Sequence, residues 1–336
     1  MIPRTDDGRQ TSAWQRELAE AVRDPVELLQ LLGLPRELLA GAHAAHGQFP
    51  LRVPRSYVDR MGKGDPRDPL LCQVLPLGEE LLAVAGFGDD PVGDLAAVAV
   101  PGLLHKYHGR ALLVATGACA VHCRYCFRRH YPYSEGAATP QRLDDALAHL
   151  ARDDSISEVI LSGGDPLALT DERLALLAER LDAIAHLRRL RIHTRLPVVL
   201  PARVDDHLLN WLARTRLKRV VVIHANHPNE IDDSVRLALR RLAECGTTLL
   251  NQSVLLRGVN DDSEVLARLS EALFDAGVMP YYVHLLDKVR GAAHFEVDAR
   301  SAQRIHESLW KRLPGYLVPR FVREEPGAPG KIPLSL

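Results

Sequence analysis

Three cysteines lie within eight residues of one another in the stretch GACAVHCRYCFRRH, residues 117–130. Cys119, Cys123 and Cys126 have the spacing C-x3-C-x2-C, and the two other cysteines, Cys72 and Cys245, lie far away. A structural zinc site usually takes four ligands. Three thiolates can instead hold three irons of a [4Fe–4S] cube and leave the fourth iron open. The spacing therefore indicates a cluster with one iron free to bind and activate a small molecule.

Other interpretations of the cysteines are a zinc site, a redox dithiol and buried apolar thiols. A C-x2-C redox pair fits Cys123 and Cys126 but leaves Cys119 without a role. Burial in an apolar core is disfavoured because charged side chains flank the motif, namely His122, Arg124 and Arg128. We therefore favour the cluster.

The stretch LSGGDPL, residues 161–167, is a second candidate because it ends a β-rich run with two glycines. Glycine has no side chain, so its backbone can approach a ligand closely. Taken alone, Gly-Gly-Asp-Pro is an ordinary turn, but its place one strand after the cysteines favours a ligand-binding loop. The candidate residues are Ser162, Gly163, Gly164 and Asp165.

Lys331 lies in a tail rich in glycine and proline, FVREEPGAPGKIPL, where a lysine is usually a solvated charge near a frayed end. Two features oppose that interpretation: the tail continues apolar as IPLSL, and only six of the 42 basic residues in the chain are lysines. A lysine amine can bind pyridoxal phosphate covalently. The phosphate of that cofactor needs cationic partners, which Lys106 and Arg110 could provide.

A parallel sheet would position these residues. From residue 111 onward, β-rich runs alternate with helical stretches. The β-rich runs cover residues 111–116, 157–164, 189–195, 219–226, 247–256 and 279–286, and the helical stretches cover 141–152, 171–185, 205–215, 231–244, 263–276 and 299–312. Six strand–helix units in series predict right-handed parallel crossovers. Six units are two short of a closed barrel, so we expect an open, partial (β/α)6 barrel whose strand-end loops gather on one face.

The chain as a whole suits such an enzyme. Its 336 residues, 46% of them hydrophobic, can bury a large core. The formal net charge of -1 provides no field that would attract nucleic acid or an anionic membrane. A polar N-terminus without an apolar run, and an odd cysteine count, indicate a cytoplasmic protein. We predict a mostly helical N-terminal extension over 1–100, the barrel over 101–312, and a C-terminal segment over 313–336 that closes the site.

Several stretches resemble one family. The cysteine motif after a first strand resembles the radical S-adenosylmethionine superfamily. CRYCFRRH, SGGDPL, RLPVVLPARV, NQSVLLRGVND and PYYVHLLD are similar to segments of lysine 2,3-aminomutase, and more closely of its short relative in the β-lysylation of translation elongation factor P. The resemblance runs from about residue 64 to Lys331, which is most of the chain.

The resemblance implies a role for each candidate. Cys119, Cys123 and Cys126 would hold the cluster, and the Ser162–Asp165 loop would bind the amino group of S-adenosylmethionine. His224 and Gln252 would line the rest of that site. Lys331 would carry pyridoxal phosphate.

Substrate recognition is implied in the same way. Arg128 would grip the carboxylate of lysine with a two-pronged hydrogen bond. Asp287 and Glu324 would meet its side-chain ammonium, and two anions facing one cation would reject substrates without a terminal positive charge.

The implied activity is the conversion of L-lysine to (R)-β-lysine by a 5′-deoxyadenosyl radical, with pyridoxal phosphate as second cofactor. The implied partners are an electron donor such as flavodoxin or ferredoxin, and elongation factor P with its lysyl ligase. One alternative is an aminomutase that makes β-lysine for another pathway. Another is a non-enzymatic iron–sulfur or zinc module that binds nucleic acid, which would show a basic face and would not need Lys331.

Two positions depart from the longer members of the family. Those members carry a zinc-binding cysteine where this chain has Asp262, so we do not expect that zinc site. They carry aspartate where this chain has Glu324, which lengthens one side of the expected lysine pocket by one methylene.

Overall fold

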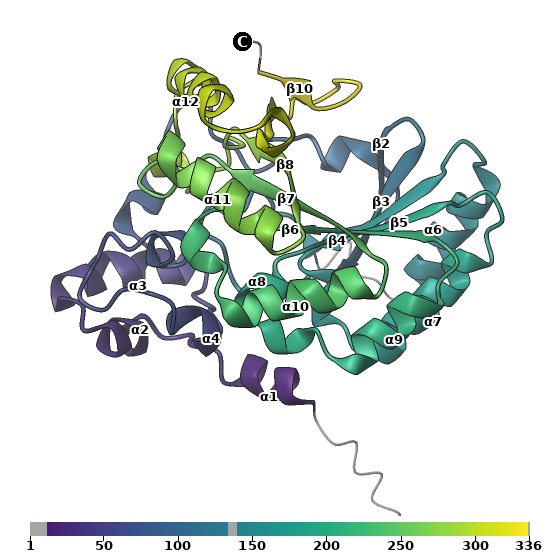
Figure 1. Ribbon diagram of the computed structural model, residues 1–336, viewed down its shortest axis with the longest axis horizontal. Helices are drawn as coiled ribbons and strands as arrows, with labels where there is room; N and C mark the ends of the chain where they lie inside the picture. Colours follow the sequence, from purple (N-terminus) through teal and green to yellow (C-terminus); the bar gives the residue numbers. More distant parts are fainter. Residues whose placement is uncertain (1–11, 134–139, 335–336) are drawn as a thin grey trace, which may run out of the picture.

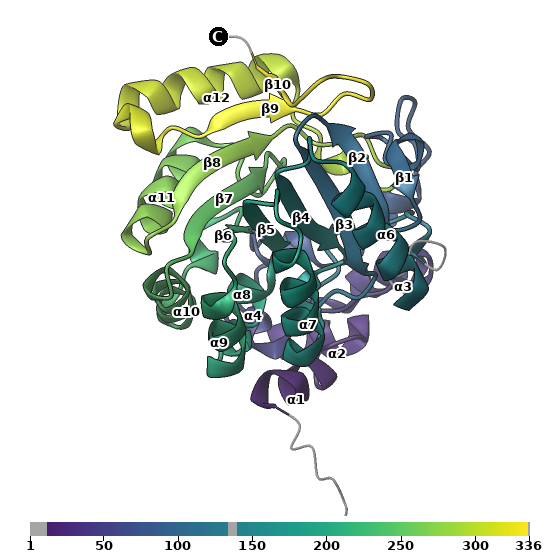
Figure 2. The ribbon, with the colours of Figure 1, turned by 90° about the vertical axis from the view of Figure 1, so that its right-hand side faces the viewer.

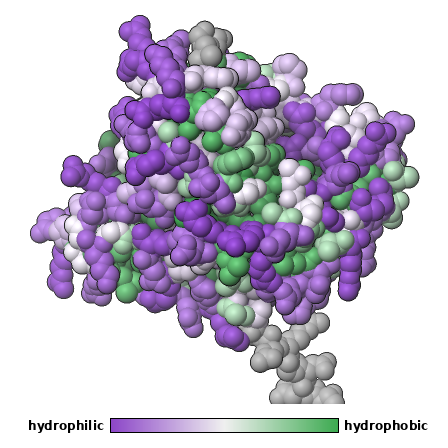
Figure 3. Space-filling model, in the orientation of Figure 1, coloured by the Kyte–Doolittle hydropathy of each residue, from purple (hydrophilic) through white to green (hydrophobic). Residues whose placement is uncertain are grey.

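The computed structural model describes residues 12–133 and 140–334. The prediction of a cytoplasmic protein rests partly on the polar N-terminus. Most of that segment, residues 1–11, lies outside the described range. Among the described helices none is long and apolar enough to cross a membrane. In Figure 3, hydrophilic side chains cover most of the visible face, and the apolar side chains between them form only small patches.

A curved, open sheet forms the centre of the described structure (Figures 1 and 2). Six consecutive parallel strands confirm the predicted units: β3 (Arg110–Thr116), β4 (Glu158–Gly163), β5 (Arg189–Thr194), β6 (Lys218–Ile223), β7 (Thr248–Val254) and β8 (Met279–His284). Most residues of β4 are buried, as expected where a parallel strand is covered on both faces.

Helices connect the parallel strands along the outer face of the sheet (Figure 2). They are α6 (Pro140–Arg152), α7 (Asp171–Asp182), α9 (Asp206–Arg214), α10 (Asp233–Glu244), α11 (Ser263–Asp275) and α12 (Ala299–Arg312), with the short α8 (Leu196–Val199) after β5. Aspartates at the starts of α9, α10, α11 and α12 accept hydrogen bonds from free backbone N–H groups of the first turn, which explains where these helices begin. One of these aspartates is Asp262.

The sheet extends beyond the six predicted strands at both edges. A hairpin of β1 (Val98–Val100) and β2 (Leu103–Tyr107) adds antiparallel strands beside β3. On the other side, β9 (Arg320–Arg323) adds a seventh parallel strand and β10 (Ile332–Pro333) pairs antiparallel with it. Because β1 and β10 are the two edges and do not pair with each other, the barrel stays open, as predicted.

Residues 12–97 are helical or irregular, with α1 (Ala13–Ala19), α2 (Pro25–Leu32), α3 (Leu39–Gln48) and α4 (Arg55–Val58), and short 3-10 turns lie between α2 and α3 and after α4. Their apolar side chains share one continuous core with the sheet, which includes Trp14, Leu28, Leu113, Leu161 and Phe321. The N-terminal segment can therefore act as the base on which the loops above β3 and β4 rest. The division of the chain at residues 100 and 312 stays a prediction.

Candidate active site

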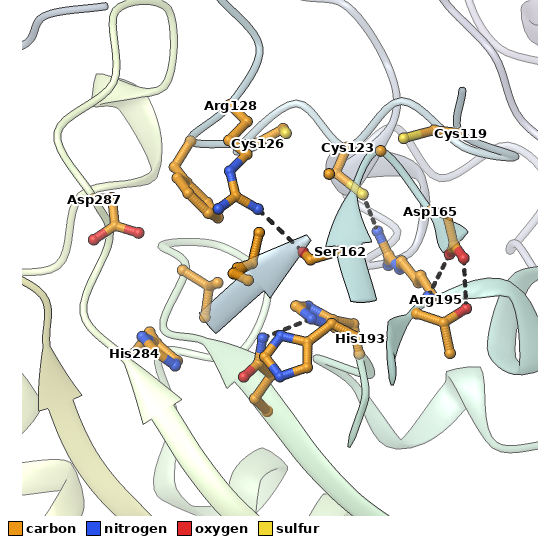
Figure 4. A pocket seen from close by; sticks show the side chains of 18 of the residues that line it. Cys119, Cys123, Cys126, Arg128, Ser162, Asp165, His193, Arg195, His284 and Asp287 are labelled. Atoms are coloured by element: carbon orange, nitrogen blue, oxygen red, sulfur yellow. Dashed lines mark hydrogen bonds between the residues drawn. The ribbon is translucent and has the colours of Figure 1, made fainter. Parts of the chain in front are cut away.

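A cavity of about 560 Å³ opens at the carboxyl ends of the parallel strands. Figure 4 shows side chains from several strand ends pointing into it. Every candidate residue identified in the sequence lines this cavity: Cys119, Cys123, Cys126, Lys106, Arg110, Arg128, Ser162, Gly163, Gly164, Asp165, His224, Gln252, Asp287, Glu324 and Lys331. Residues that are up to 225 positions apart in the sequence, at Lys106 and Lys331, thus share one space.

The cysteine loop after β3 is fastened by the N-terminal segment. The guanidinium of Arg124 is fully buried and donates to both carboxylate oxygens of Glu80, at 2.8 and 2.6 Å. Arg129 donates to the same carboxylate at 2.8 Å. The charges that flank the motif do not keep it out of the interior, contrary to the prediction. Arg124 and Arg128 are buried because acidic partners neutralise them, and the cysteines are half-buried.

The three cysteines are one ligand short of a structural zinc site, which usually takes four. Cys119, Cys123 and Cys126 all line the cavity, and no fourth cysteine does so among the described residues. They suit a cubane in which three irons take one cysteine each and the fourth stays open. Burial and the neighbouring Cys123 raise the pKa of Cys126 to about 11, so this thiol is protonated at neutral pH.

The two glycines of the second loop are required by the fold itself. Gly163 has φ +113, and a side-chain carbon there would lie 2.6 Å from the carbonyl oxygen of Thr116. A side-chain carbon on Gly164 would lie 2.4 Å from the carbonyl oxygen of Ala118. The glycines thus let the second loop pack directly against the cysteine loop, which brings Ser162 and the cysteine sulfurs to the same cavity.

Asp165 fixes this loop through its carboxylate. Its Oδ1 accepts from the hydroxyl of Thr194 at 2.7 Å, and its Oδ2 accepts from the backbone N–H of Arg195 at 2.7 Å. The N–H groups of Leu167 and Leu196 also donate to it. Burial raises the pKa of Asp165 above its ordinary value, and these donors oppose the shift. Its carboxylate is therefore occupied by the chain, which leaves the backbone and Ser162 as the more available groups of this loop.

His224 and Gln252 form a hydrogen-bonded pair across β6 and β7, with 2.7 Å between Gln252 Nε2 and His224 Nε2. Burial, and the charges of Arg195 and Lys331, lower the pKa of His224 to about 3, so its imidazole is neutral. With Nε2 accepting from the amide of Gln252, the ring proton lies on Nδ1. The pair is therefore oriented to present polar groups to a ligand.

Arg128 and Lys106 share a carboxylate that sequence reasoning missed, Asp94. Arg128 Nε donates to Asp94 Oδ2 at 2.6 Å, and Lys106 Nζ lies 2.6 Å from Asp94 Oδ1. Arg128 Nη1 also donates to Ser162 Oγ at 3.1 Å. Asp94 is almost fully buried and comes from the irregular stretch before β1, where no periodicity marks it as a site residue.

Glu324 binds both lysines of the cavity. Lys331 Nζ donates to Glu324 Oε2 at 3.0 Å, and Lys106 Nζ donates to Glu324 Oε1 at 3.1 Å. Burial alone would favour the neutral acid, but the two ammonium groups lower the pKa of Glu324 to about 2. Glu324 is therefore ionised at neutral pH.

The segment that carries Lys331 is anchored to the sheet. Ile332 pairs with Arg323 in the β9–β10 ladder, and the N–H of Leu334 donates to the carbonyl of Phe321 at 2.8 Å. The alternative of a solvated lysine at a frayed end is therefore wrong, because the residues that follow Lys331 hold its side chain at the cavity.

Asp287, on the loop after β8, differs from Glu324 in its surroundings. No hydrogen bond or ion pair joins its carboxylate to the part of the chain that the structure describes, although it lines the same cavity. Burial and the nearby Glu324 carboxylate raise the pKa of Asp287 to about 7, and the lysines oppose the shift. Asp287 is thus a carboxyl group that a bound cation could ionise.

Aromatic and imidazole side chains complete the cavity, and sequence reasoning missed them. The ammonium of Lys331 lies 5.8 Å from the ring centre of Tyr282, and the guanidinium of Arg110 lies 4.6 Å from that of Tyr107. His193 and His284 line the cavity with buried Nε2 atoms that have no partner among the described residues. Unpaired buried polar atoms on a cavity wall are expected where a polar ligand completes the site.

Comparison with known proteins agrees with this geometry. The model of the Radical SAM superfamily matches residues 113–270. L-lysine 2,3-aminomutase of Escherichia coli (strain K12) is 53% identical over 325 residues, which cover 96% of this chain and 94% of that protein. L-lysine 2,3-aminomutase of Haemophilus influenzae is 47% identical and covers 98% of both chains. L-lysine 2,3-aminomutase of Clostridium subterminale is 34% identical over 96% of this chain and 77% of that protein.

Proposed function

Because the chain belongs to the L-lysine 2,3-aminomutase family of radical S-adenosylmethionine enzymes, we propose that it moves the α-amino group of L-lysine to the β-carbon and forms (R)-β-lysine. The observation that carries this proposal is the single cavity, which joins a three-cysteine loop to a lysine, two carboxylates and an arginine. The three-cysteine loop suits a radical-generating cluster. The charged side chains suit an amino acid that has a carboxylate and a second ammonium group.

At one end of the cavity, Cys119, Cys123 and Cys126 would hold a [4Fe–4S] cluster. When bound, the cluster and S-adenosylmethionine supply the 5′-deoxyadenosyl radical that abstracts hydrogen from the substrate. Ser162 and the backbone of the Gly163–Gly164 turn would orient the methionine part of S-adenosylmethionine. The electron would come from a small donor such as flavodoxin or ferredoxin.

His224 and Gln252 would bind the remainder of S-adenosylmethionine. The neutral imidazole and the amide offer both a donor and an acceptor at the cavity wall. They would therefore act by position, without exchanging a proton.

At the other end, Lys331 would bind pyridoxal phosphate, which when bound supplies a π-system for the unpaired electron beside the migrating nitrogen. Lys331 Nζ has one hydrogen-bond partner among the described residues, Glu324. The only other lysine that lines the cavity, Lys106, already donates to Val92 O and Glu324 and lies 2.6 Å from Asp94. Lys331 therefore has the less engaged amine of the two and is the better placed to act as a nucleophile.

Arg110 and Lys106 would hold the phosphate. The Arg110 guanidinium lies against the Tyr107 ring and makes no hydrogen bond to the described part of the chain, so its N–H groups are free for an anion. Lys106 is held in place as a cation by Asp94 and Glu324.

Three charged side chains would orient the substrate. Arg128 would face the carboxylate, since its Nη2 makes no hydrogen bond within the described residues. Asp287 and Glu324 would face the terminal ammonium. Because only Asp287 lacks a cation partner here, we propose that it is the first of the two to pair with the substrate.

The product would be passed to a lysyl ligase that attaches β-lysine to translation elongation factor P in the cytoplasm. This step rests on the resemblance of the short segments to the β-lysylation enzyme, and the identity is higher to the Escherichia coli protein than to the Clostridium subterminale protein. Incubating the enzyme, lysine, ligase and elongation factor P together should give a modified factor with the mass of added β-lysine. Accumulation of free β-lysine without modified factor would instead favour supply to another pathway.

The central test is anaerobic reconstitution of the protein with iron, sulfide and pyridoxal phosphate. We expect about four irons per chain and formation of β-lysine when L-lysine, S-adenosylmethionine and a reductant are added. Cys119→Ser, Cys123→Ser and Cys126→Ser should each lose most of the iron and the activity, measured by metal analysis and by chromatography of the product. Cys72→Ser and Cys245→Ser are matched controls that should keep both. A full cluster in any of the first three variants would contradict the ligand assignment.

The kcat/KM for lysine should also depend on pH, because it depends on the ionisation of Asp287. Its pKa of about 7 means that the carboxyl is neutral below this pH and ionised above it. Only the ionised form attracts an ammonium group, so kcat/KM for lysine should rise as pH increases through 7. Asp287→Asn should flatten this part of the profile. An equally steep rise in that variant would show that another group titrates.

A further inference from the structure

Arg195 connects the cysteine loop to a buried polar network beneath it. It follows β5, is 6% exposed and lines the cavity. Its Nη1 donates to Cys123 Sγ at 2.8 Å, which Figure 4 shows as a dashed line. Its Nη2 donates to Gln73 Oε1 at 2.6 Å, Tyr57 Oη at 3.0 Å and Glu230 Oε2 at 3.0 Å.

The surroundings hold this guanidinium charged and in one orientation. It lies 5.4 Å from the ring centre of Tyr57 and 5.7 Å from that of Tyr125. Arginine keeps its charge in folded proteins, and the buried carboxylate of Glu230 lies 3.0 Å from Nη2. The N–H at Nε is buried and has no partner among the described residues. Nη2 is thus fixed by groups inside the fold, and Nη1 donates to the cysteine loop.

We infer that Arg195 is a positioning residue that raises the reduction potential of the cluster by donating a charged hydrogen bond to the sulfur of Cys123. This inference rests on the proposed cluster at the three cysteines. When the oxidised cluster, [4Fe–4S]²⁺, takes one electron from the donor and becomes [4Fe–4S]⁺, negative charge increases at its sulfur ligands. A fixed positive donor stabilises that charge and so favours the reduced form.

A purely structural role explains only part of the geometry. Glu230 Oε1 is already satisfied by Gln73 and by the N–H groups of Asn226 and His227, so the network beneath does not require Arg195 to reach the cysteine loop. The bond to Cys123 Sγ uses the opposite end of the guanidinium. A structural residue would alter folding and cluster content when replaced, whereas a tuning residue alters the potential of a cluster that is present.

The experiment is a redox titration of the cluster-loaded protein, followed by the electron paramagnetic resonance of the reduced cluster. Arg195→Gln removes the charge, and Arg195→Lys keeps the charge but loses the planar fork. We expect Arg195→Gln to shift the one-electron reduction equilibrium about tenfold toward the oxidised form, which is a decrease of about 59 mV. Arg195→Lys should show a smaller shift in the same direction. Arg180→Gln, which removes an exposed arginine paired with Asp144, is the charge-matched control and should keep the wild-type potential.

Each outcome decides one point. A wild-type potential in cluster-loaded Arg195→Gln overturns the inference and leaves the cluster assignment intact. If the wild-type protein binds no cluster, the proposed function itself fails. If Arg195→Gln takes up too little iron to titrate, Arg195→Lys decides: a lower potential supports the inference, and a wild-type potential overturns it.

Discussion

Replacing Lys331 with alanine is expected to abolish covalent binding of pyridoxal phosphate and to remove all measurable β-lysine formation. The cavity contains two lysines, and they differ in how their amines are engaged. Lys106 lies against Asp94, Glu324 and a backbone carbonyl, while Lys331 has Glu324 as its hydrogen-bond partner. Since the nucleophile must be free to move toward the cofactor, the lysine with fewer partners is the better candidate.

The measurement is borohydride treatment of the pyridoxal phosphate-loaded protein, followed by mass spectrometry of its peptides. The pyridoxyl group should be found on Lys331 in the wild-type protein and should be absent from Lys331→Ala, which should still take up its iron. Lys288→Ala is the matched control, because Lys288 is an exposed lysine one residue after Asp287 and pairs with Glu296. Finding the label on Lys106 would transfer the catalytic assignment to that residue.

The six central strands and their helices could be predicted because periodicity is strong there. β4 contains the short apolar run of residues 159–161, and α10 and α11 present one apolar face each. The edge strands could not be predicted in the same way. β10 has only two residues, one of them proline, and β9 has four. Their pairing is decided by the neighbouring strand and not by local pattern.

The motif residues of the candidate site could be predicted from the sequence more readily than the contacts that hold them in place. The cysteine spacing and the glycine pair are short local motifs, so they could be recognised without the fold. Asp94 could not, because its importance depends on two cations that come from β2 and from the cysteine loop. Arg195, the residue directly after β5, was not identified individually, because its contact with Cys123 spans 72 positions of the chain.

One carboxylate in the cavity contacts both lysines that we propose bind the cofactor. Glu324 pairs with Lys331, which we propose binds the cofactor, and with Lys106, which we propose holds its phosphate. When Lys331 binds pyridoxal phosphate covalently, it no longer offers an ammonium group to Glu324. The ammonium of the substrate could then take that place, so one carboxylate would serve both the resting and the loaded protein.

Asp287→Asn and Glu324→Gln are each expected to lower kcat/KM for lysine by about a hundredfold or more, since removing one partner of a buried charge pair costs about 3–5 kcal/mol. Asp287 has no cation partner of its own, so its replacement should affect lysine alone and leave iron content and pyridoxal phosphate binding normal. Glu324 also holds two lysines, so its replacement should weaken cofactor binding as well.

A lysine analogue without the terminal ammonium, norleucine, separates recognition of the side chain from general damage. The wild-type protein should strongly prefer lysine, because norleucine would give the Asp287 carboxylate no cation to pair with. In Asp287→Asn the ratio of kcat/KM for lysine to that for norleucine should fall. The variant lowers kcat/KM for lysine, whose ammonium loses its partner, and leaves kcat/KM for norleucine unchanged. Asp89→Asn, at an exposed aspartate paired with Arg290, is the matched control and should keep the wild-type ratio. The measurement is the ratio of kcat/KM for the two amino acids, and an unchanged ratio in Asp287→Asn would place the substrate ammonium elsewhere in the cavity.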